Sequence, residues 1–583
     1  MTLIPVEIFR HVFEYFSDDK RSLLSCLLVN KRWCGIAVSI LWRDPFSYIK
    51  GTSTSLITTY LSCLDVNERE ILVKSGIDLK LLFEKKPTFE YAEFLRKLTY
   101  VDFYESSLAW LQSITEEKIN NNDSKIFIIT KELCKSFMNK CPKILNLNIN
   151  LEPLHFQLPD NFTDYVAIPC FPNSENSLSQ LQVFVCCGNY DKKKIFMALS
   201  KYSKNISTLY IDYYLDDNIT SAPTSLALLI KSQRSLQTFR IDTYYRSLSK
   251  IIPALESQHK TLKEIKFRGI DFEEGVTFAP LVPCKNLESL IFMTCDNVKN
   301  EATKPLESAH FPKLKKLVFH VEQSRPPLAL PSLIVNNCNT LQEISLGLPP
   351  VDSQDDPRII ETIIEFCKNL TTFEAHLQIH QLESLLISCN HLEKLIARGR
   401  EPLRVDEFLP HIGKIIPKSL RTLVIHAIWS FTPNTLKEFL DYCIAPLETI
   451  GFPDCYAIND DHLFNFSEYA KEIGSLKTLN IKSASRISRK AFETAKSVIE
   501  NIEHCGSYCD EDEEPKSVIE NNEHCDNYCD EDEEPKSDIE NNEHCDNYCD
   551  ENEEPKSDIE NMEHYGNYYD EDEPKHCDDE EEE

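Results

Sequence analysis

The residues best suited to bind a metal lie near the end of the chain, where the spacing His-Cys-x-x-x-Cys occurs three times. Imidazole and thiolate groups are ligands that zinc prefers, but zinc sites usually combine two closely spaced pairs. Each copy here offers one pair, and a fourth copy has Tyr565 and Tyr569 in place of both cysteines. The sequence therefore predicts no metal site. The three copies begin at His504, His524 and His544.

Glycine-dependent catalytic and nucleotide-binding motifs are also missing from the sequence. The chain has 13 glycines, and no G-x-G-x-x-G, P-loop or G-x-S-x-G can be written with them. There is no H-E-x-x-H, and no nucleophile–base pair stands out. We therefore expect no catalytic residue and no cofactor, and an enzyme is the least favoured of the functions considered below.

Charge is divided very unevenly along the chain. The net charge is −32, and the last 88 residues carry −31 of it, with 36 acidic residues and five lysines. These residues are four near-copies of a 20-residue unit, from Lys496 onward, and an acidic coda. Low hydrophobicity, high charge and a proline in every copy predict disorder over 496–583. The near-neutral remainder gives no electrostatic reason to expect nucleic-acid binding.

Targeting signals and membrane spans are not recognisable. No apolar run approaches the roughly 20 residues that a bilayer span needs, and the first 16 residues do not have the pattern of a signal peptide. The chain has 22 cysteines, and most of those outside the acidic copies sit among apolar neighbours. This favours reduced thiols. We expect an intracellular protein, cytoplasmic or nuclear, with no membrane partner.

Residues 1–46 have the spacing of three short helices. Pro5 suits the first turn of a helix, and Ile8, Phe9, Val12 and Phe13 follow at helical spacing. The other two segments are equally apolar and include two tryptophans. Three helices in so few residues cannot bury all of this surface among themselves, so a partner protein is its natural cover.

The string IPVEIFRHVFEYF…SLLSCLLVNKRWCGIAVSILWRDPF closely resembles the F-box family, although Ile4 stands where the family usually has leucine. In that family the motif docks on the small adaptor subunit of SCF-type cullin–RING ubiquitin ligases, and through it reaches a cullin. The other interpretation is an ordinary helical cap whose tryptophans pack on the following domain. The resemblance implies that the following residues lie at or behind the adaptor interface: Ile4, Pro5, Ile8, Phe9, Val12, Phe13, Leu28, Val29, Trp33 and Trp42.

One apolar phrase recurs through the rest of the body, with apolar residues at its first, fourth and sixth positions. Its starts lie about 27 residues apart, the period of leucine-rich repeats. Each unit alone exposes an apolar face, which stacking buries. The array resembles a degenerate form of the cysteine-containing leucine-rich repeats. The phrases start at Ile144, Leu181, Ile206, Leu236, Leu262, Leu287, Leu314, Leu341, Leu370, Leu392, Leu420, Leu447 and Leu476.

The predicted fold class is therefore α/β. We expect a helical F-box at 1–46, a helical linker at 47–94, a leucine-rich-repeat solenoid at 95–495 and a disordered acidic tail at 496–583. Parallel strands should line the concave side and helices the convex side. The proline-rich stretch 150–177 interrupts the array, as either a contact loop or a packing insertion.

Two positions of each phrase, the fifth and the seventh, should point out of the concave sheet. They place apolar side chains next to basic ones, as in a protein-recognition surface. The alternative is that a curled inner sheet simply tolerates apolar residues. The candidate target-binding residues are an apolar anchor at Ile291, Met293 and Val318, the basic rim of Lys266 and Arg268, and His320.

Three functions remain open at this point. The first is a substrate receptor of an SCF-type ubiquitin ligase, which holds the adaptor at one end and a target protein on the repeats. The second is a binding scaffold unconnected with ubiquitin, and the third is an enzyme. The sequence does not identify the target, a recognition mark on it, or the role of the acidic tail.

Overall fold

A computed structural model describes residues 5–49, 51–79, 87–115, 120, 123–154, 162–213, 222–243, 248–272, 275–321, 326–347, 357–484 and 486–505. The chain divides into two units, residues 1–513 and 514–583. All described residues lie in the first unit. The disorder predicted for the acidic copies beyond residue 505 lies outside them.

The first three helices are α1 (Val6–Glu14), α2 (Lys20–Leu27) and α3 (Lys31–Leu41). Side chains define where the second and third begin. Asp19 accepts a hydrogen bond from the Ser22 N–H at 3.1 Å, and Asn30 accepts one from the Trp33 N–H at 3.0 Å. Such caps satisfy amide groups that a helix start leaves without partners.

A short helical region connects these helices to the repeats. It contains α4 (Thr54–Ser62), α5 (Val66–Lys74) and the 3-10 segments η1 (Pro45–Tyr48) and η3 (Tyr91–Phe94). At the start of α5, Asp65 and Glu68 form a capping box, in which each side chain accepts a hydrogen bond from the backbone of the other. None of the helices that the structure describes has both the length and the apolar character of a membrane span.

One parallel sheet of fifteen strands runs through the described part of the body. The order of the strands in the sheet is their order along the chain, apart from two short strands that pair outside it, and neighbours pair in parallel. The strands are β1 (Lys97–Thr99), β2 (Asn146–Asn150), β3 (Val183–Cys187), β4 (Thr208–Tyr213), β5 (Thr238–Thr243), β6 (Glu264–Arg268), β7 (Ser289–Cys295), β8 (Lys316–Val321), β9 (Glu343–Leu346), β10 (Thr372–His376), β11 (Lys394–Arg398), β13 (Thr422–His426), β15 (Thr449–Gly451), β16 (Thr478–Asn480) and β17 (Asn501–Glu503).

Helical segments connect most of the consecutive strands, and two short strands, β12 (Leu403–Arg404) and β14 (Trp429–Ser430), pair separately. The helices are α6 (Tyr100–Ile114), α7 (Ser124–Lys140), α8 (Thr163–Val166), α9 (Ser174–Ser177), α10 (Lys193–Tyr202), α11 (Ala222–Ser232), α12 (Ile251–Leu255), α13 (Asn300–Thr303), α14 (Leu330–Asn337), α15 (Pro357–Phe366), α16 (Ile379–Ser388), α17 (Leu409–Ile415), α18 (Pro433–Tyr442), α19 (Asp460–Ile473) and α20 (Arg489–Lys496), with the 3-10 segments η4 (Ile168–Cys170), η5 (Glu256–Gln258), η6 (Ala279–Leu281) and η7 (Lys304–Ser308).

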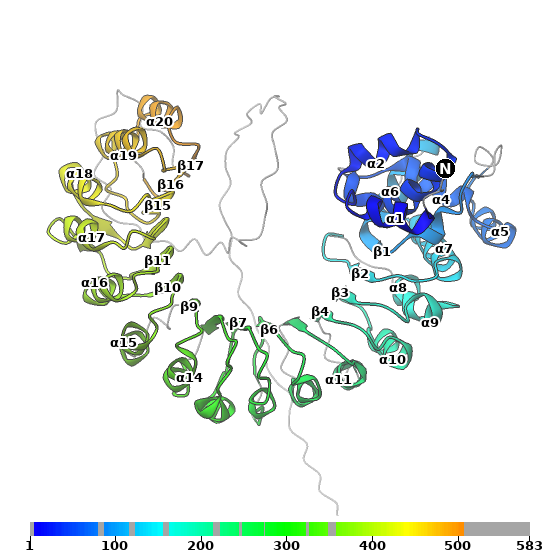
Figure 1. Ribbon diagram of the computed structural model, residues 1–583, viewed down its shortest axis with the longest axis horizontal. Helices are drawn as coiled ribbons and strands as arrows, with labels where there is room; N and C mark the ends of the chain where they lie inside the picture. Colours follow the sequence, from blue (N-terminus) through cyan, green and yellow to red (C-terminus); the bar gives the residue numbers. More distant parts are fainter. Residues whose placement is uncertain are drawn as a thin grey trace, which may run out of the picture. The chain divides into compact units, whose positions relative to one another are not determined.

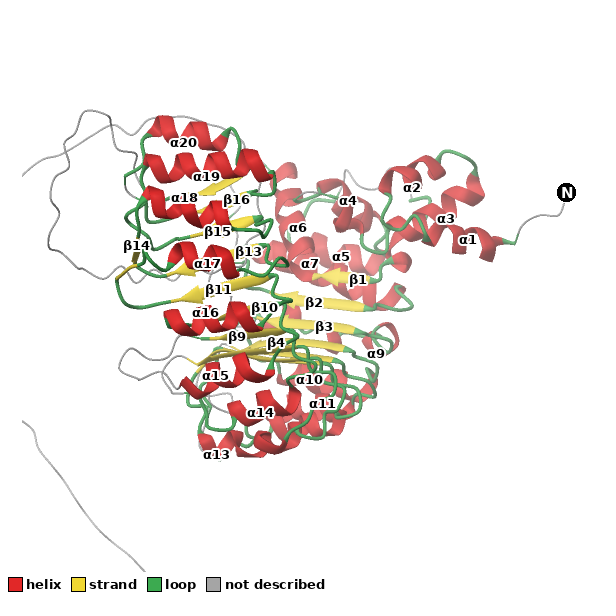
Figure 2. Cartoon of the chain, turned by 60° about the vertical axis from the view of Figure 1, so that its left-hand side comes forward, coloured by secondary structure: helices red, strands yellow, loops and turns green. Residues whose placement is uncertain are grey.

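Within this unit the strands line the inner side of an arc and the helices cover its outer side (Figure 1). The apolar residues of the repeated phrase point between the two layers. Leu262, Ile265 and Phe267 of one repeat are all fully buried, and their counterparts in the other repeats are buried too, except for the half-buried Leu346 of β9. The predicted leucine-rich-repeat α/β solenoid is confirmed. Figure 2 shows the strands stacked along the body, with α1, α2 and α3 at one end beside α4.

The C-terminal end of the array lies beyond its predicted limit. The sheet continues beyond residue 495, because α20 and β17 use the start of the first acidic copy, and Thr478 pairs with Asn501. The proline-rich stretch that interrupts the array packs inward where it is described. Phe162, Val166 and Ile168 are buried in the core of the solenoid, which favours the packing insertion over the contact loop.

Candidate functional site

The N-terminal helices enclose a small core of their own. Phe13, Leu23 and Ile36, one from each helix, are buried in it. The ring of Trp33 lies 5.2 Å from that of Phe13 and 5.7 Å from that of Phe9, measured between centroids. Aromatic pairs at such distances and tilts hold each other in fixed orientations.

A groove of about 540 Å³ opens on the surface of this core. Aromatic and aliphatic side chains of α1 form one wall, and polar side chains of α2 form part of the other. Two of its apolar residues remain largely open to solvent, Ile8 at 53% and Val12 at 45% exposure. The groove is lined by Ile8, Phe9, Val12, Phe13, Phe16, Arg21, Ser22, Ser25, Cys26 and Trp33.

The turn between α2 and α3 adds a second exposed apolar surface. Leu28 is 89% exposed and Val29 is 55% exposed, although residues of these types are usually buried. Leu24, on α2, is also exposed. A cluster of exposed aliphatic residues on a small helical unit is typical of a protein-binding surface.

The predicted adaptor-binding residues fall into three groups. Pro5, Ile8, Val12, Leu28 and Val29 are exposed, whereas Phe9 and Trp33 are half-buried and Phe13 supports them from inside. Ile4 lies outside the described residues. Whether these residues bind an adaptor stays a prediction.

Trp42 packs on the core of the N-terminal helices and extends away from this surface, so its place at or behind the adaptor interface stays a prediction. Its ring lies 5.2 Å from that of Tyr60 and 4.1 Å from that of Tyr91, both of which belong to the connecting region. Trp42 therefore joins the N-terminal helices to the following region. The interpretation in which a tryptophan packs on the next domain holds for this residue.

Polar residues of the groove were missed by the sequence analysis. Ser22, Ser25 and Cys26 lie on one face of α2 at a spacing of three and four residues. This spacing was visible in the sequence, but only apolar positions were considered. Arg32 was missed as well, and its guanidinium lies 5.1 Å from the centroid of the Phe9 ring, a cation–π contact at the rim.

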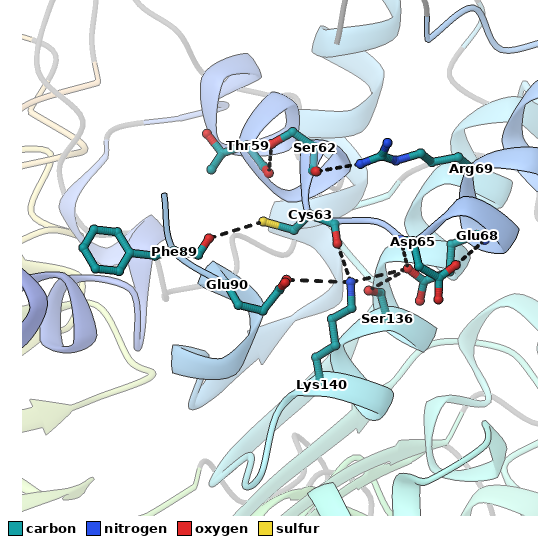
Figure 3. A network of polar contacts seen from close by, with 10 residues as sticks. All are labelled: Thr59, Ser62, Cys63, Asp65, Glu68, Arg69, Phe89, Glu90, Ser136 and Lys140. Atoms are coloured by element: carbon teal, nitrogen blue, oxygen red, sulfur yellow. Dashed lines mark hydrogen bonds and ion pairs between the residues drawn. The ribbon is translucent and has the colours of Figure 1, made fainter. Parts of the chain in front are cut away.

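A buried polar network holds the connecting region against the first repeat (Figure 3). The Lys140 ammonium of α7 donates to the carbonyl oxygen of Cys63 and lies 3.6 Å from a carboxylate oxygen of Glu68 and 3.7 Å from one of Glu90. The Ser136 hydroxyl donates to Glu68 at 3.2 Å. Because Glu68 and Lys140 are mostly shielded from water, each needs the other as a partner.

The concave face differs from its prediction in one respect. The predicted apolar anchor is not exposed, because Ile291 is only 8% and Val318 only 5% accessible. These two residues pair in register on β7 and β8. On the inner side of a curved sheet, side chains from neighbouring strands converge and cover each other. Met293 remains half-buried at this place.

The other predicted target-binding residues are half-buried on the same face. Lys266 and Arg268 lie side by side with Ile291 and Met293 in register. Arg268 approaches Asp242 to 3.9 Å, so part of the predicted basic rim is neutralised within the sheet. Binding of a target by these residues stays a prediction.

His320 belongs to a polar chain across the concave face. Its Nε2 atom lies 2.7 Å from the Ser345 hydroxyl, which donates to Glu374 at 2.9 Å. Glu374 also accepts a hydrogen bond of 2.6 Å from Arg398. Since the hydroxyl has one proton to donate, His320 must be the donor in its own contact with Ser345.

Burial and these partners set the protonation states of His320 and Glu374. Burial lowers the pKa of His320, and the nearby Glu374 carboxylate opposes this shift only in part. Burial would raise the pKa of Glu374, but hydrogen bonds from Arg398 and Ser345 hold it below its usual value. The arrangement has serine between histidine and glutamate, so it does not activate the hydroxyl as a nucleophile.

The comparison with protein families identifies the N-terminal segment. The F-box-like family matches residues 1–48. Residues 1–48 form an F-box-like domain. This assignment agrees with the three short helices and the exposed groove. The comparison with curated proteins found no match.

Among solved structures, the chain is similar to an internalin (inlF) from Listeria monocytogenes, with 11% identity and a TM-score of 0.31 over 55% of this chain and 84% of that one. It is also similar to the structure of the Rad7 and Elc1 complex in yeast, with 13% identity and a TM-score of 0.30 over 55% of this chain and 69% of that one.

In the described part of the chain, no group of three or more histidine, cysteine or acidic residues could hold a metal ion.

Proposed function

We propose that this protein is the substrate-recognition subunit of an SCF-type cullin–RING ubiquitin ligase. The observation that carries the proposal is the F-box-like domain, with its groove and its exposed Ile8, Val12 and Leu28. An apolar groove flanked by exposed aliphatic residues is suited to receive a helix of the small adaptor subunit. The solenoid would then present a target protein on its concave face.

In this role the protein performs no chemistry of its own. It raises the effective concentration of the target near the ligase by holding both at once. The F-box-like domain is attached to the repeats by Trp42 and by the network around Lys140, so the two binding surfaces would be held in a fixed relation.

Co-expression of the full chain with the small adaptor subunit tests the proposal. A stable complex that co-purifies through size exclusion supports it. If the chain elutes alone in the presence of excess adaptor, it is instead a scaffold unconnected with ubiquitin.

A further inference from the structure

Two aspartates stand side by side on the concave face. Asp212 of β4 and Asp242 of β5 are register partners, and parallel strands place such residues about 4.8 Å apart. The preceding residues, Ile211 and Ile241, are fully buried between sheet and helices. Since side chains alternate along a strand, both aspartates project to the opposite, inner side.

Each aspartate has a buried oxygen without a hydrogen-bond partner among the residues that the structure describes. Asp212 is only 2% exposed, and its Oδ2 atom accepts no hydrogen bond. The Oδ1 atom of Asp242 is also without a partner, whereas its Oδ2 accepts a hydrogen bond of 2.8 Å from the Tyr210 hydroxyl. Buried acceptors without a hydrogen-bond partner are rare, because leaving one unpaired reduces stability.

In the described part of the chain, no charged group donates a hydrogen bond to these two atoms, although the charge of Lys192 favours the ionised form of Asp212. Glu152 adds a third carboxyl group, whose interaction with Asp212 disfavours that form. The Lys192 ammonium is buried nearby and donates to the carbonyl oxygen of Gly188, and the 3.9 Å contact of Arg268 is with Oδ2 of Asp242. Burial and the contact with Glu152 raise the pKa of Asp212 to about 8. Asp212 therefore keeps its proton near neutral pH.

We propose that Asp212, Asp242 and Glu152 form a cation-binding subsite on the concave face, which receives an arginine side chain of a target protein. Carboxylate oxygens only accept hydrogen bonds, and a guanidinium group only donates them. Its planar fork offers diverging N–H groups that can reach two carboxylates at once, which a lysine ammonium matches less well. Glu152, exposed at the rim, would be the first acid that the side chain meets.

The incoming guanidinium group would replace the proton on Asp212, which leaves to solvent. The two oxygens without partners would then accept N–H groups, so that their desolvation is compensated on binding. A metal ion is the weaker choice of ligand, because no group of metal-binding residues is found in the described ranges. The inference deepens the proposed function, since it names the chemistry of the target, and it rests on that function for the identity of the ligand as a target.

The test uses the purified full chain without adaptor, so that its outcome is independent of adaptor binding. The probe is the capped peptide acetyl-Gly-Ser-Arg-Ser-Gly-amide, and its matched control contains citrulline, which has the same shape without the charge. Binding is followed by saturation-transfer NMR at 150 mM salt. We expect saturable binding of the arginine peptide and a loss of affinity of about tenfold or more in the variant Asp212→Asn/Asp242→Asn.

The acidic tail could attract any cation, so the control variant must carry the same charge change elsewhere. Glu301→Gln/Glu307→Gln changes two exposed acids on the outer side of the same unit and should bind as the wild type does. Glu152→Gln, at an exposed position that cannot disturb the core, should also weaken binding. Equal affinity of the wild type and Asp212→Asn/Asp242→Asn, or equal binding of the citrulline peptide, would overturn the proposal.

Discussion

The carbonyl oxygen of Arg43 accepts a backbone hydrogen bond of 2.8 Å from the N–H of Arg96. The same oxygen accepts a second hydrogen bond, of 3.0 Å, from the N–H of Lys97. The carbonyl oxygen of Arg96 likewise accepts two hydrogen bonds, from the N–H groups of Leu145 and Asn146. The same arrangement, in which one carbonyl oxygen accepts two backbone hydrogen bonds, recurs between successive repeats. The end of the F-box-like domain therefore takes the place that a preceding repeat would have beside β1.

Trp42 should act on stability, not on adaptor contact. Trp42→Ala removes the ring that packs on Tyr60 and Tyr91, and we expect a loss of about 3 kcal/mol in the free energy of unfolding. Urea denaturation followed by circular dichroism measures this loss. Adaptor affinity of the folded variant should stay near that of the wild type, and a stable variant with lost affinity would contradict the assignment.

The Lys140–Glu68 pair should show strong coupling. Lys140→Met leaves the buried Glu68 without its cation and should cost about 3 kcal/mol. Glu68→Gln in the same chain removes the stranded charge, so the double variant should recover part of the loss. A double-mutant cycle by urea denaturation measures the coupling, and additive losses would show that the contact in Figure 3 contributes nothing.

Local spacing predicted the helices and strands, because apolar periodicity reports which face of an element is buried. It could not predict contacts between distant segments. Trp42 looks like a surface residue until Tyr60 and Tyr91 are folded onto it. The alternation along β7 placed Ile291 on the concave face, but its low exposure depends on the curvature of the sheet and on Val318 of the next strand.

The C-terminal limit of the solenoid was also beyond sequence analysis. Asn501–Glu503 lies in an acidic copy that resembles the copies after it, yet it forms β17. Its position next to β16 supplies backbone partners at the end of the sheet, and Ile502, which packs against the core, stands where the next two copies have Asn522 and Asn542. The proximity of Asp212 and Glu152 could not be predicted for a similar reason. Glu152 lies in the stretch that interrupts the array, and the repeat pattern does not define the path of that stretch.

Asp212 should give the protein an unusual dependence of stability on pH. Its folded-state pKa of about 8 lies above the ordinary value of 3.8. The native state therefore binds this proton more tightly than the unfolded state, and the free energy of unfolding should fall as pH rises from about 4 to about 8. Asp212→Asn carries no such proton and should lack this fall.

Urea denaturation of both proteins at pH 5, 6.5 and 8 measures the effect. Glu152, Lys192 and Asp242 face Asp212 and remain in the variant, so the difference between the two proteins isolates the aspartate. The stability of Asp212→Asn relative to wild type should increase at each step. A difference that does not change with pH would contradict the raised pKa of Asp212.

The exposed groove of the F-box-like domain should bind the small adaptor subunit. The most direct test is the affinity of the purified full chain for this subunit, measured by isothermal titration calorimetry for the wild type and two variants. Ile8→Glu/Val12→Glu puts two charges into the groove, and Val66→Glu/Val73→Glu puts the same charges on exposed apolar positions of α5. We predict that the groove variant loses about 100-fold or more in affinity while the α5 variant binds as the wild type does. A wild type that does not bind the adaptor, or a folded groove variant that binds it equally well, would contradict the account.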